Sequence, residues 1–206
     1  MNAMQHARIS AKRWGGEAED YYEIHNFIDS TKILCSDARH RILHTLWGVS
    51  QVVVPIFGHS IQNSAGKSID VKDLCERDHL LVDYQQRFIP TLHDFVGSID
   101  PQQLPAHFTI QIEQLHEQYI NNPEISKLLL SPLNITGKLE SLLLTHNSWF
   151  LGEILPQMGY GTFSLQPIGL TPADFFNAMH FELWMDNGMA LPKSAQALQQ
   201  RKHIFN

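Results

Sequence analysis

The sequence has few cysteines, no long apolar run and no excess of positive charge, and each absence excludes a class of protein. Of the 206 residues only two are cysteines, Cys35 and Cys75, and neither belongs to a C-x-x-C motif. A disulfide framework or a thiolate zinc site is therefore not expected. No stretch of about 18 apolar residues occurs, which argues against a membrane-spanning helix.

The charge balance is acidic. Lysine and arginine number 15 and aspartate and glutamate 21, so the net charge is −6 with histidine neutral. Proteins that bind nucleic acid through a broad electrostatic surface need clustered Lys and Arg, so no nucleic-acid partner is expected. Residues 1–13 are polar and lack the apolar segment of a secretory signal. These features together predict a cytoplasmic protein.

Histidine is abundant: the chain has twelve, against about five in a chain of average composition. The densest stretch of reactive side chains is residues 37–44. On an α-helix, residues three and four positions apart are neighbours, so His40 and His44 would share a face with Asp37. Two imidazoles and a carboxylate on one face can hold a metal ion or act as acid and base.

Helical periodicity dominates the chain, with one exception. Asn63-Ser64-Ala65-Gly66 is a turn between short extended runs, which predicts a β-hairpin near residues 60–71. The fold is therefore predicted to be mainly α, a multi-helix bundle with one small hairpin. Residues 1–100 are expected to form a helical domain that carries the histidines, and residues 101–206 a helical extension or second domain. The predicted helices are 3–14, 19–27, 31–54, one from about residue 73, 108–121, 123–130, 137–158 and one that begins at Thr171.

Many short motifs in the first hundred residues have the order and spacing of a known family. They are His6 with Trp14-Gly15-Gly16, Asp20-Tyr21, Ile24-His25, Asp29-Ser30 with Lys32, Asp37 with Arg39-His40-Arg41, Phe57-Gly58, Asn63-Ser64 with Gly66-Lys67, Val71, Glu76, His79, Asp83 and Ile89-Pro90-Thr91. With them, residues 1–100 resemble a family of small bacterial and phage proteins that share a domain of unknown function. The resemblance implies a common fold and site, but no reaction. The family has Glu two residues before the histidine that matches His79, whereas here Glu76 is three residues before it.

Five histidines form the candidate metal set, with acidic residues nearby as further ligands. Imidazole and carboxylate donors suit Zn, Fe, Mn or Ni. The histidines are His6, His25, His40, His44 and His79, and the acids are Asp37, Glu76, Asp78 and Asp83. The first hypothesis is a metal-binding protein that, if it is an enzyme, is a hydrolase acting through a metal-bound water on an unknown small molecule.

The three charged residues around His40 are the predicted catalytic residues. Asp37 would be a metal ligand or would orient one. Arg39 and Arg41 flank His40, and two guanidinium groups beside an imidazole can bind phosphate or carboxylate through paired hydrogen bonds. The alternative is that both arginines form salt bridges with neighbouring acids.

Two further patterns match known metal sites more weakly. Ferritin-like di-iron bundles use Glu-x-x-His pairs on their helices, and metal-dependent phosphohydrolases of the H…HD…D kind use a His-Asp doublet. The pairs in this chain are Glu76 with His79 and Glu113 with His116, and the doublet is His93-Asp94.

The second hypothesis belongs to a different class, a non-catalytic interaction or structural module. The histidines would then be buried polar groups that join helices through hydrogen bonds. An exposed aromatic cluster in the second half, Phe175, Phe176, Phe181 and Trp184, would bind a protein partner or a second copy of the chain. The two hypotheses differ in whether the histidine side chains converge on one point.

Overall fold

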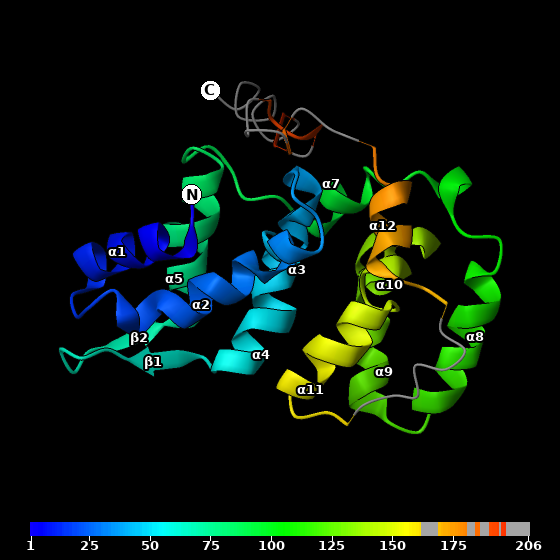
Figure 1. Cartoon of the computed structure of the whole chain (residues 1–206), viewed down its shortest axis with the longest axis horizontal. Coiled ribbons are helices and arrows are strands. Elements are labelled where there is room, and N and C mark those ends of the chain that lie inside the picture. The colour runs from blue at the N-terminus through cyan, green and yellow to red at the C-terminus, as the bar shows by residue number, and fades with distance from the viewer. Residues whose placement is uncertain (162–168, 181–183, 186–189, 194, 197–206) are drawn as a thin grey trace, which may run out of the picture. The chain divides into compact units, whose positions relative to one another are not determined.

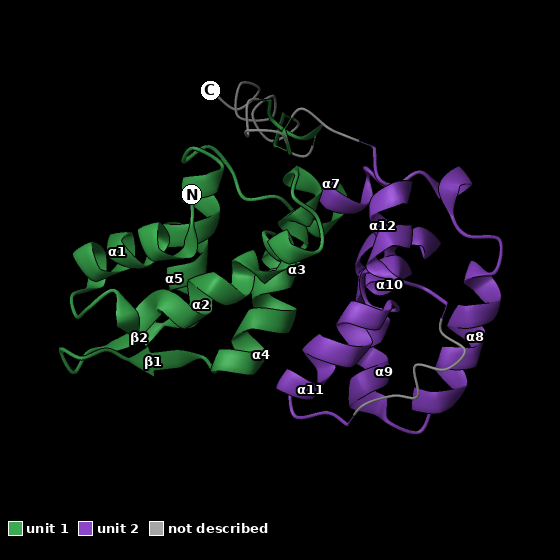
Figure 2. Ribbon diagram, in the orientation of Figure 1, with its two compact units in different colours: residues 1–94, 181–206 green, residues 95–180 purple. Residues whose placement is uncertain are grey.

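The computed structural model describes residues 1–161, 169–180, 184–185, 190–193 and 195–196. Contacts within the chain divide it into two compact units, residues 1–94 with 181–206 and residues 95–180 (Figure 2). Compact units are not by themselves independently folding domains, so the predicted division near residue 100 stays a prediction. Among the described residues, no helix has the length and apolar character needed to cross a membrane.

The fold is mainly α-helical with a two-stranded antiparallel hairpin, which confirms the predicted class. Helix α7 (Leu92–Val96) spans the boundary between the two units. The other elements of the first unit are α1 (Ala3–Trp14), α2 (Glu19–Asp29), η1 (Ser30–Ile33), η2 (Ala38–Leu43), α3 (Leu46–Gly48), η3 (Val49–Val53), α4 (Val54–Phe57), β1 (Ser60–Gln62), β2 (Ser68–Asp70), α5 (Val71–Leu74), η4 (Cys75–Leu80) and α6 (Leu81–Asp83) (Figure 1).

Helix α1 has the predicted bounds because both of its ends are specified locally. Asn2 and Gln5 form a capping box, and Gly15 ends the helix with a φ of 84°. Its buried residues are spaced like one face of a helix: Ala3, His6, Ala7 and Ser10. This face packs against α2, which lies beside α1 in Figure 1. His6 therefore points inward, as the sequence predicts.

The single helix predicted for residues 31–54 is wrong. The chain forms the short 3-10 helices η1 and η2 there, with a kink at Arg41, and a longer helix begins only at Leu46. Asp37 and Thr45 are extended, and the side chain of each accepts a backbone N–H from the following turn. Such side chains compete with continued helix and start new turns instead. His40 and His44 consequently do not have α-helical spacing.

The hairpin is confirmed, with Ile61 paired to Ile69. Asn63 fixes its turn: the side-chain oxygen accepts hydrogen bonds from the backbone nitrogens of Ala65 and Lys67. The Asn63 amide also donates to the hydroxyl of Tyr21 at 2.9 Å, which joins the turn to α2. The hairpin then leads directly into the helix that carries part of the candidate site.

Residues 71–83 form a continuous helix whose central part, η4, is π-helical. Asp70 caps its first turn by accepting a hydrogen bond from the backbone nitrogen of Asp73 at 2.7 Å. The helix ends before Gln85 and Gln86, which both have positive φ values, 56° and 60°. Wide π turns occur frequently at functional sites because they displace side chains from regular α positions. This one contains His79.

The second unit is also helical. Its helices are η5 (Pro101–Gln103), α8 (Phe108–Tyr119), α9 (Pro123–Leu129), α10 (Ser131–Thr136), η6 (Leu139–Leu144), η7 (Phe150–Ile154), α11 (Leu155–Gln157) and α12 (Pro172–Ala178). The single helix predicted for residues 137–158 is wrong, because the Asn147 side chain bonds carbonyls before it and backbone nitrogens after it. The predicted start at Thr171 is confirmed by a capping box with Asp174.

The aromatic cluster expected on the surface is mostly buried. Phe175 is 1% exposed, Phe176 6% and Trp184 5%, while Phe181 lies outside the described residues. The prediction of an exposed aromatic docking surface is therefore wrong for these three residues. Large apolar side chains are normally placed in cores, and a sequence pattern that spreads around a helix does not reveal which side is covered.

Candidate metal centre

Two histidines and two aspartates bring one donor atom each to a common point in the first unit. Asp29 ends α2, His44 follows η2, His79 lies in η4 and Asp83 ends α6. The four donor atoms all lie within 4.8 Å of one another. Both histidines are fully buried, and the side chains of Asp29 and Asp83 are 7% and 6% exposed. The four donors therefore come from parts of the chain that span 54 residues of sequence, from Asp29 to Asp83.

The separations between the donor atoms fit a tetrahedral metal ion. The two Nε2 atoms of His44 and His79 are 3.1 Å apart, and each is 3.4 Å from Asp29 Oδ1. From Asp83 Oδ2, the distances to the same two nitrogens are 3.3 and 3.8 Å. Metal–ligand bonds of about 2.0–2.2 Å in a tetrahedron require edges of about 3.3–3.6 Å. The buried histidines and aspartates could thus hold a metal ion.

Several buried polar atoms here have no hydrogen-bond partner among the described residues. They include Asp29 Oδ2, His44 Nδ1 and His6 Nε2. The two Nε2 atoms of His44 and His79 also face each other, although at most one of them can donate a proton to the other. Buried polar groups are normally paired, because leaving them unpaired costs free energy. A cation between the four donors would separate the two facing Nε2 atoms and pair both of them, although the three unpaired atoms named above are not among the four donors.

The protonation states of the donors also suit a cation. Burial lowers the pKa of His79 to about 3, so this imidazole is neutral at pH 7. For Asp29 burial alone would raise the pKa, but its interactions with His44 and His79 outweigh burial and hold the pKa well below its ordinary value. For Asp83 the interactions with His44 and His6 have the same effect. Two ionised carboxylates and a neutral imidazole are the forms that bind metal.

A second layer of polar side chains orients His79. The Nδ1 atom of His79 lies 3.0 Å from His25 Nδ1, and His25 Nε2 lies 2.8 Å from the Ser10 hydroxyl. Burial, followed by the nearby His79, holds the pKa of His25 well below its ordinary value, so this ring is also neutral. Ligand histidines usually donate their second ring N–H to such a partner, which fixes the tautomer. His25 is therefore placed to hold His79 Nε2 toward the centre.

Of the predicted metal ligands, His6, His25, His44 and His79 lie together, and His40 lies at the edge of the group. The His40 and His44 rings are 5.4 Å apart in an edge-to-face arrangement. His40 Nδ1 bonds the backbone carbonyl of Asp37, and burial lowers the pKa of His40 to about 4. The five histidines thus converge on one region, although only His44 and His79 belong to the set of four donors.

The predicted catalytic residues Asp37, Arg39 and Arg41 interact elsewhere. Arg39 pairs with Asp37, with contacts of 2.7–3.1 Å to both carboxylate oxygens, and this bond holds the pKa of Asp37 well below its ordinary value. The Arg41 guanidinium lies over the Tyr84 ring at 5.0 Å and donates to the Met185 carbonyl. These contacts match the salt-bridge alternative for Arg39 and a packing role for Arg41.

Sequence reasoning missed Asp29 as a donor and named it within the Asp29-Ser30 motif of the family resemblance. A helical spacing signal was present: Asp29 follows His25 by four residues, as Asp83 follows His79 by four. Two helices thus each carry a His and an Asp on one face. Asp29 also forms an ion pair with Lys32 Nζ at 2.7 Å, and the Lys32 side chain is 39% exposed. This ammonium group lies on the solvent side of the centre.

The other metal patterns in the sequence do not join the centre. His93 is exposed, and Asp94 accepts hydrogen bonds from the backbone nitrogen and hydroxyl of Thr91, as in a helix cap. Glu113 lies in the second unit and is exposed. Glu76 lies beside Lys72, 3.5 Å from its ammonium group. Among the described residues, the group of Asp29, His44, His79 and Asp83 is the one with metal-binding spacing.

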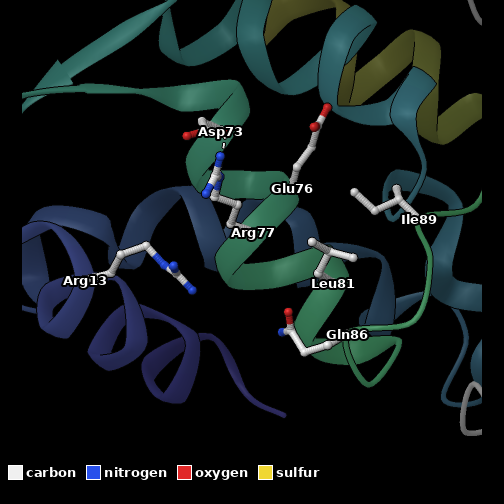
Figure 3. A pocket seen from close by; sticks show the side chains of 7 residues that line it. All are labelled: Arg13, Asp73, Glu76, Arg77, Leu81, Gln86 and Ile89. Carbon is white, nitrogen blue, oxygen red and sulfur yellow. Dashed lines mark hydrogen bonds and ion pairs between the residues drawn. The ribbon is translucent and has the colours of Figure 1, made fainter.

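A surface pocket of about 330 Å³ lies beside the helix of residues 71–83, but none of the four donors lines it. Figure 3 shows the side chains of Glu76 and Arg77 at its wall, with Arg77 paired to Asp73. Arg13, also at the wall, is paired with the buried Asp78 at 2.6 Å. Because both arginines are already paired with acids, the pocket offers no strong site for an anion.

The segment of the chain that contains these donors matches a known protein family. A family model described as a domain of unknown function, DUF6915, matches residues 1–104. The chain belongs to the DUF6915 family. The resemblance read from the sequence is confirmed, and the DUF6915 segment contains all four donors together with His6, His25 and His40. Comparisons with curated proteins and with solved structures gave no significant match.

Proposed function

We propose that this DUF6915 chain binds a divalent transition-metal ion through His44 Nε2, His79 Nε2, Asp29 Oδ1 and Asp83 Oδ2. The observation that carries the proposal is the set of donor separations: the two nitrogens are 3.1 Å apart and lie 3.3–3.8 Å from the carboxylate oxygens, and all four donors lie within 4.8 Å of one another. Mixed imidazole and carboxylate donors favour Zn, Fe, Mn or Ni over Mg or Ca. The near-tetrahedral edges favour Zn among these.

The four donors support a tightly held ion better than a hydrolytic one. Structural zinc sites have four protein ligands, whereas catalytic sites leave one position to water. Here all four donor residues are almost completely buried. Binding would join α2, the segment after η2, and the helix of residues 71–83. Metal binding of this kind adds its free energy to folding.

Metal content of untagged protein tests the proposal. Wild-type chain is compared with His44→Ala/His79→Ala, and with the exposed pair His59→Ala/His107→Ala as the matched control. We expect at least one equivalent of metal in the wild type and in the control, and one equivalent less in the first variant. A cobalt-loaded sample should show the intense visible absorption of tetrahedral Co²⁺.

Wild-type protein that takes up no Zn, Fe, Mn, Ni or Co when these ions are supplied in excess would refute the proposal. Circular dichroism of each variant separates loss of donors from loss of fold. If the donor variant retains as much metal as the wild type, the ion is bound elsewhere and the assignment of donors is wrong.

A further inference from the structure

His6 is the buried histidine that the four-donor centre does not use. It is fully buried, and its ring stacks on that of His79 with centroids 3.9 Å apart and an interplanar angle of 10°. His6 Nδ1 lies 2.7 Å from the backbone carbonyl of Asp78. Since a carbonyl can only accept, Nδ1 carries the proton and Nε2 has a free lone pair in the neutral ring.

The lone pair of His6 points at another acceptor. His6 Nε2 lies 3.1 Å from Asp83 Oδ1, and no described residue gives it a hydrogen bond. The Met1 amino group also approaches this oxygen, at 3.4 Å. A neutral imidazole nitrogen and a carboxylate oxygen at this distance are two facing acceptors, which repel each other unless a proton or a metal cation lies between them. The separation is again close to the edge expected for two ligands of one metal ion.

The two carboxylate oxygens of Asp83 face two different groups of histidine nitrogens, and each group could bind its own metal ion. Asp83 Oδ2 faces His44 and His79, while Asp83 Oδ1 faces His6. The stacked rings of His6 and His79 both direct Nε2 toward this carboxylate. Ions bound to two parallel rings 3.9 Å apart would have a similar separation, and two-metal sites have ions about 3.5–4 Å apart.

We propose that the chain holds a second divalent transition-metal ion between His6 Nε2 and Asp83 Oδ1, so that Asp83 bridges two ions. This inference rests on the proposed function, because Asp83 is a ligand of the first ion as well. The second ion has two described protein donors, which leaves positions for water or for oxygen atoms of a ligand. It is therefore the ion suited to hydrolytic chemistry, in contrast to the enclosed first ion.

Metal stoichiometry of the full chain tests the inference, with Mn²⁺ and Zn²⁺ as probes. We expect the wild type to bind two ions and His6→Gln to bind one. With Mn²⁺, the carboxylate-bridged pair should give an exchange-coupled electron paramagnetic resonance spectrum, and His6→Gln the six-line spectrum of an isolated ion. The exposed variant His59→Gln is the control and should behave like the wild type.

The outcomes separate this inference from the proposed function. Saturation of the wild type at one ion overturns the second site and leaves the first intact. No bound ion overturns both. Two ions in His6→Gln also overturn the inference, since the second ion would then not depend on the His6 imidazole. The wild-type count decides the question even if His6→Gln fails to fold.

Discussion

The ring nitrogens of His25 and His79 belong to one connected set of hydrogen bonds. His79 Nδ1 faces His25 Nδ1, so one of the two must donate, and His25 Nε2 reaches the Ser10 hydroxyl. A metal on His79 Nε2 requires the proton on His79 Nδ1. His25 then accepts through Nδ1 and donates through Nε2 to Ser10. The three side chains thus form one chain of hydrogen bonds that prepares His79 as a ligand.

Removal of His25 should weaken metal binding without abolishing it. We expect His25→Phe to lower the affinity for Zn²⁺ about 10- to 100-fold, because His79 loses the partner that orients it. Ser10→Ala, one step farther from the ion, should have a smaller effect. Competition with a chromophoric chelator measures both. His25→Gln should lose less affinity than His25→Phe, because an amide can still hydrogen-bond His79. An unchanged affinity in His25→Phe would show that His25 does not position His79.

A second buried histidine, His146 in the other unit, should make stability depend on pH. Burial lowers its pKa to about 4, and Tyr119 donates to its Nε2 at 2.6 Å. The unfolded chain protonates this ring near its ordinary pKa of about 6.5. Between pH 6.5 and 4 the unfolded state therefore binds more protons, so stability falls as the pH is lowered.

The contribution of His146 can be measured by chemical denaturation at pH 7.5 and pH 4.5. We expect His146→Gln to lose less stability between the two values than the wild type does. The exposed His107→Gln is the control and should retain the wild-type pH dependence. Equal losses in the wild type and in His146→Gln would contradict this account. Other buried histidines contribute to the total, so the difference between variants is the relevant quantity.

The individual helices are defined by side chains that start and stop them. Asp37, Thr45 and Asn147 each bond backbone nitrogens inside stretches with continuous apolar periodicity, and each divides a long predicted helix. Buried polar bonds then fasten the resulting pieces to one another. Asp78, fully buried in η4, accepts hydrogen bonds from Arg13 and Trp14 at 2.6 and 2.7 Å and so anchors the end of α1.

Loss of this anchor should destabilise the first unit. We expect Asp78→Ala to cost about 1–3 kcal/mol, because the half-buried Trp14 and the more exposed Arg13 both lose the fully buried carboxylate that accepts their hydrogen bonds. Asp73→Ala on the same helix removes an exposed ion pair with Arg77 and should cost less than about 1 kcal/mol. Thermal denaturation of both variants without metal makes the comparison. Similar midpoints would show that Asp78 is not an anchor.

Across the whole molecule, the metal-binding residues are confined to one of the two compact units. All four donors and His6 lie in residues 1–94, and none lies in residues 95–180. A ligand that binds the folded state stabilises the part of the structure that it holds together. The second unit contains none of the proposed ligands and has its own buried polar pair, Tyr119 and His146.

We therefore expect added metal to slow amide hydrogen exchange in the first unit and to leave the second unit almost unchanged. On addition of Zn²⁺ we expect slower exchange in α1, α2 and residues 71–83, and little change in α8 and α9. A chelator should reverse the effect, and His44→Ala/His79→Ala should not show it. Protection that increases equally in both units would mean that the ion stabilises the whole chain, and protection in the second unit alone would place the ion elsewhere.

Local chemistry in the sequence determined several features of this protein by itself. The capping box at Asn2 and Gly15 bounds α1, and the Asn63 turn fixes the hairpin. The scarcity of thiols and the abundance of imidazoles limited the candidate site to histidine and carboxylate. Each of these conclusions depends on residues that are close in sequence, where geometry follows from backbone preferences.

Only the tertiary structure decided which side chains meet. His44 and His79 are 35 residues apart, and Asp29 and Asp83 are 54 apart, yet their donor atoms lie within 4.8 Å. Of the dense cluster at residues 37–44, His44 joins the four donors, while Asp37 and Arg39 pair with each other. Periodicity shows which face of a helix is buried; packing between helices, which no local pattern encodes, sets what that face contacts.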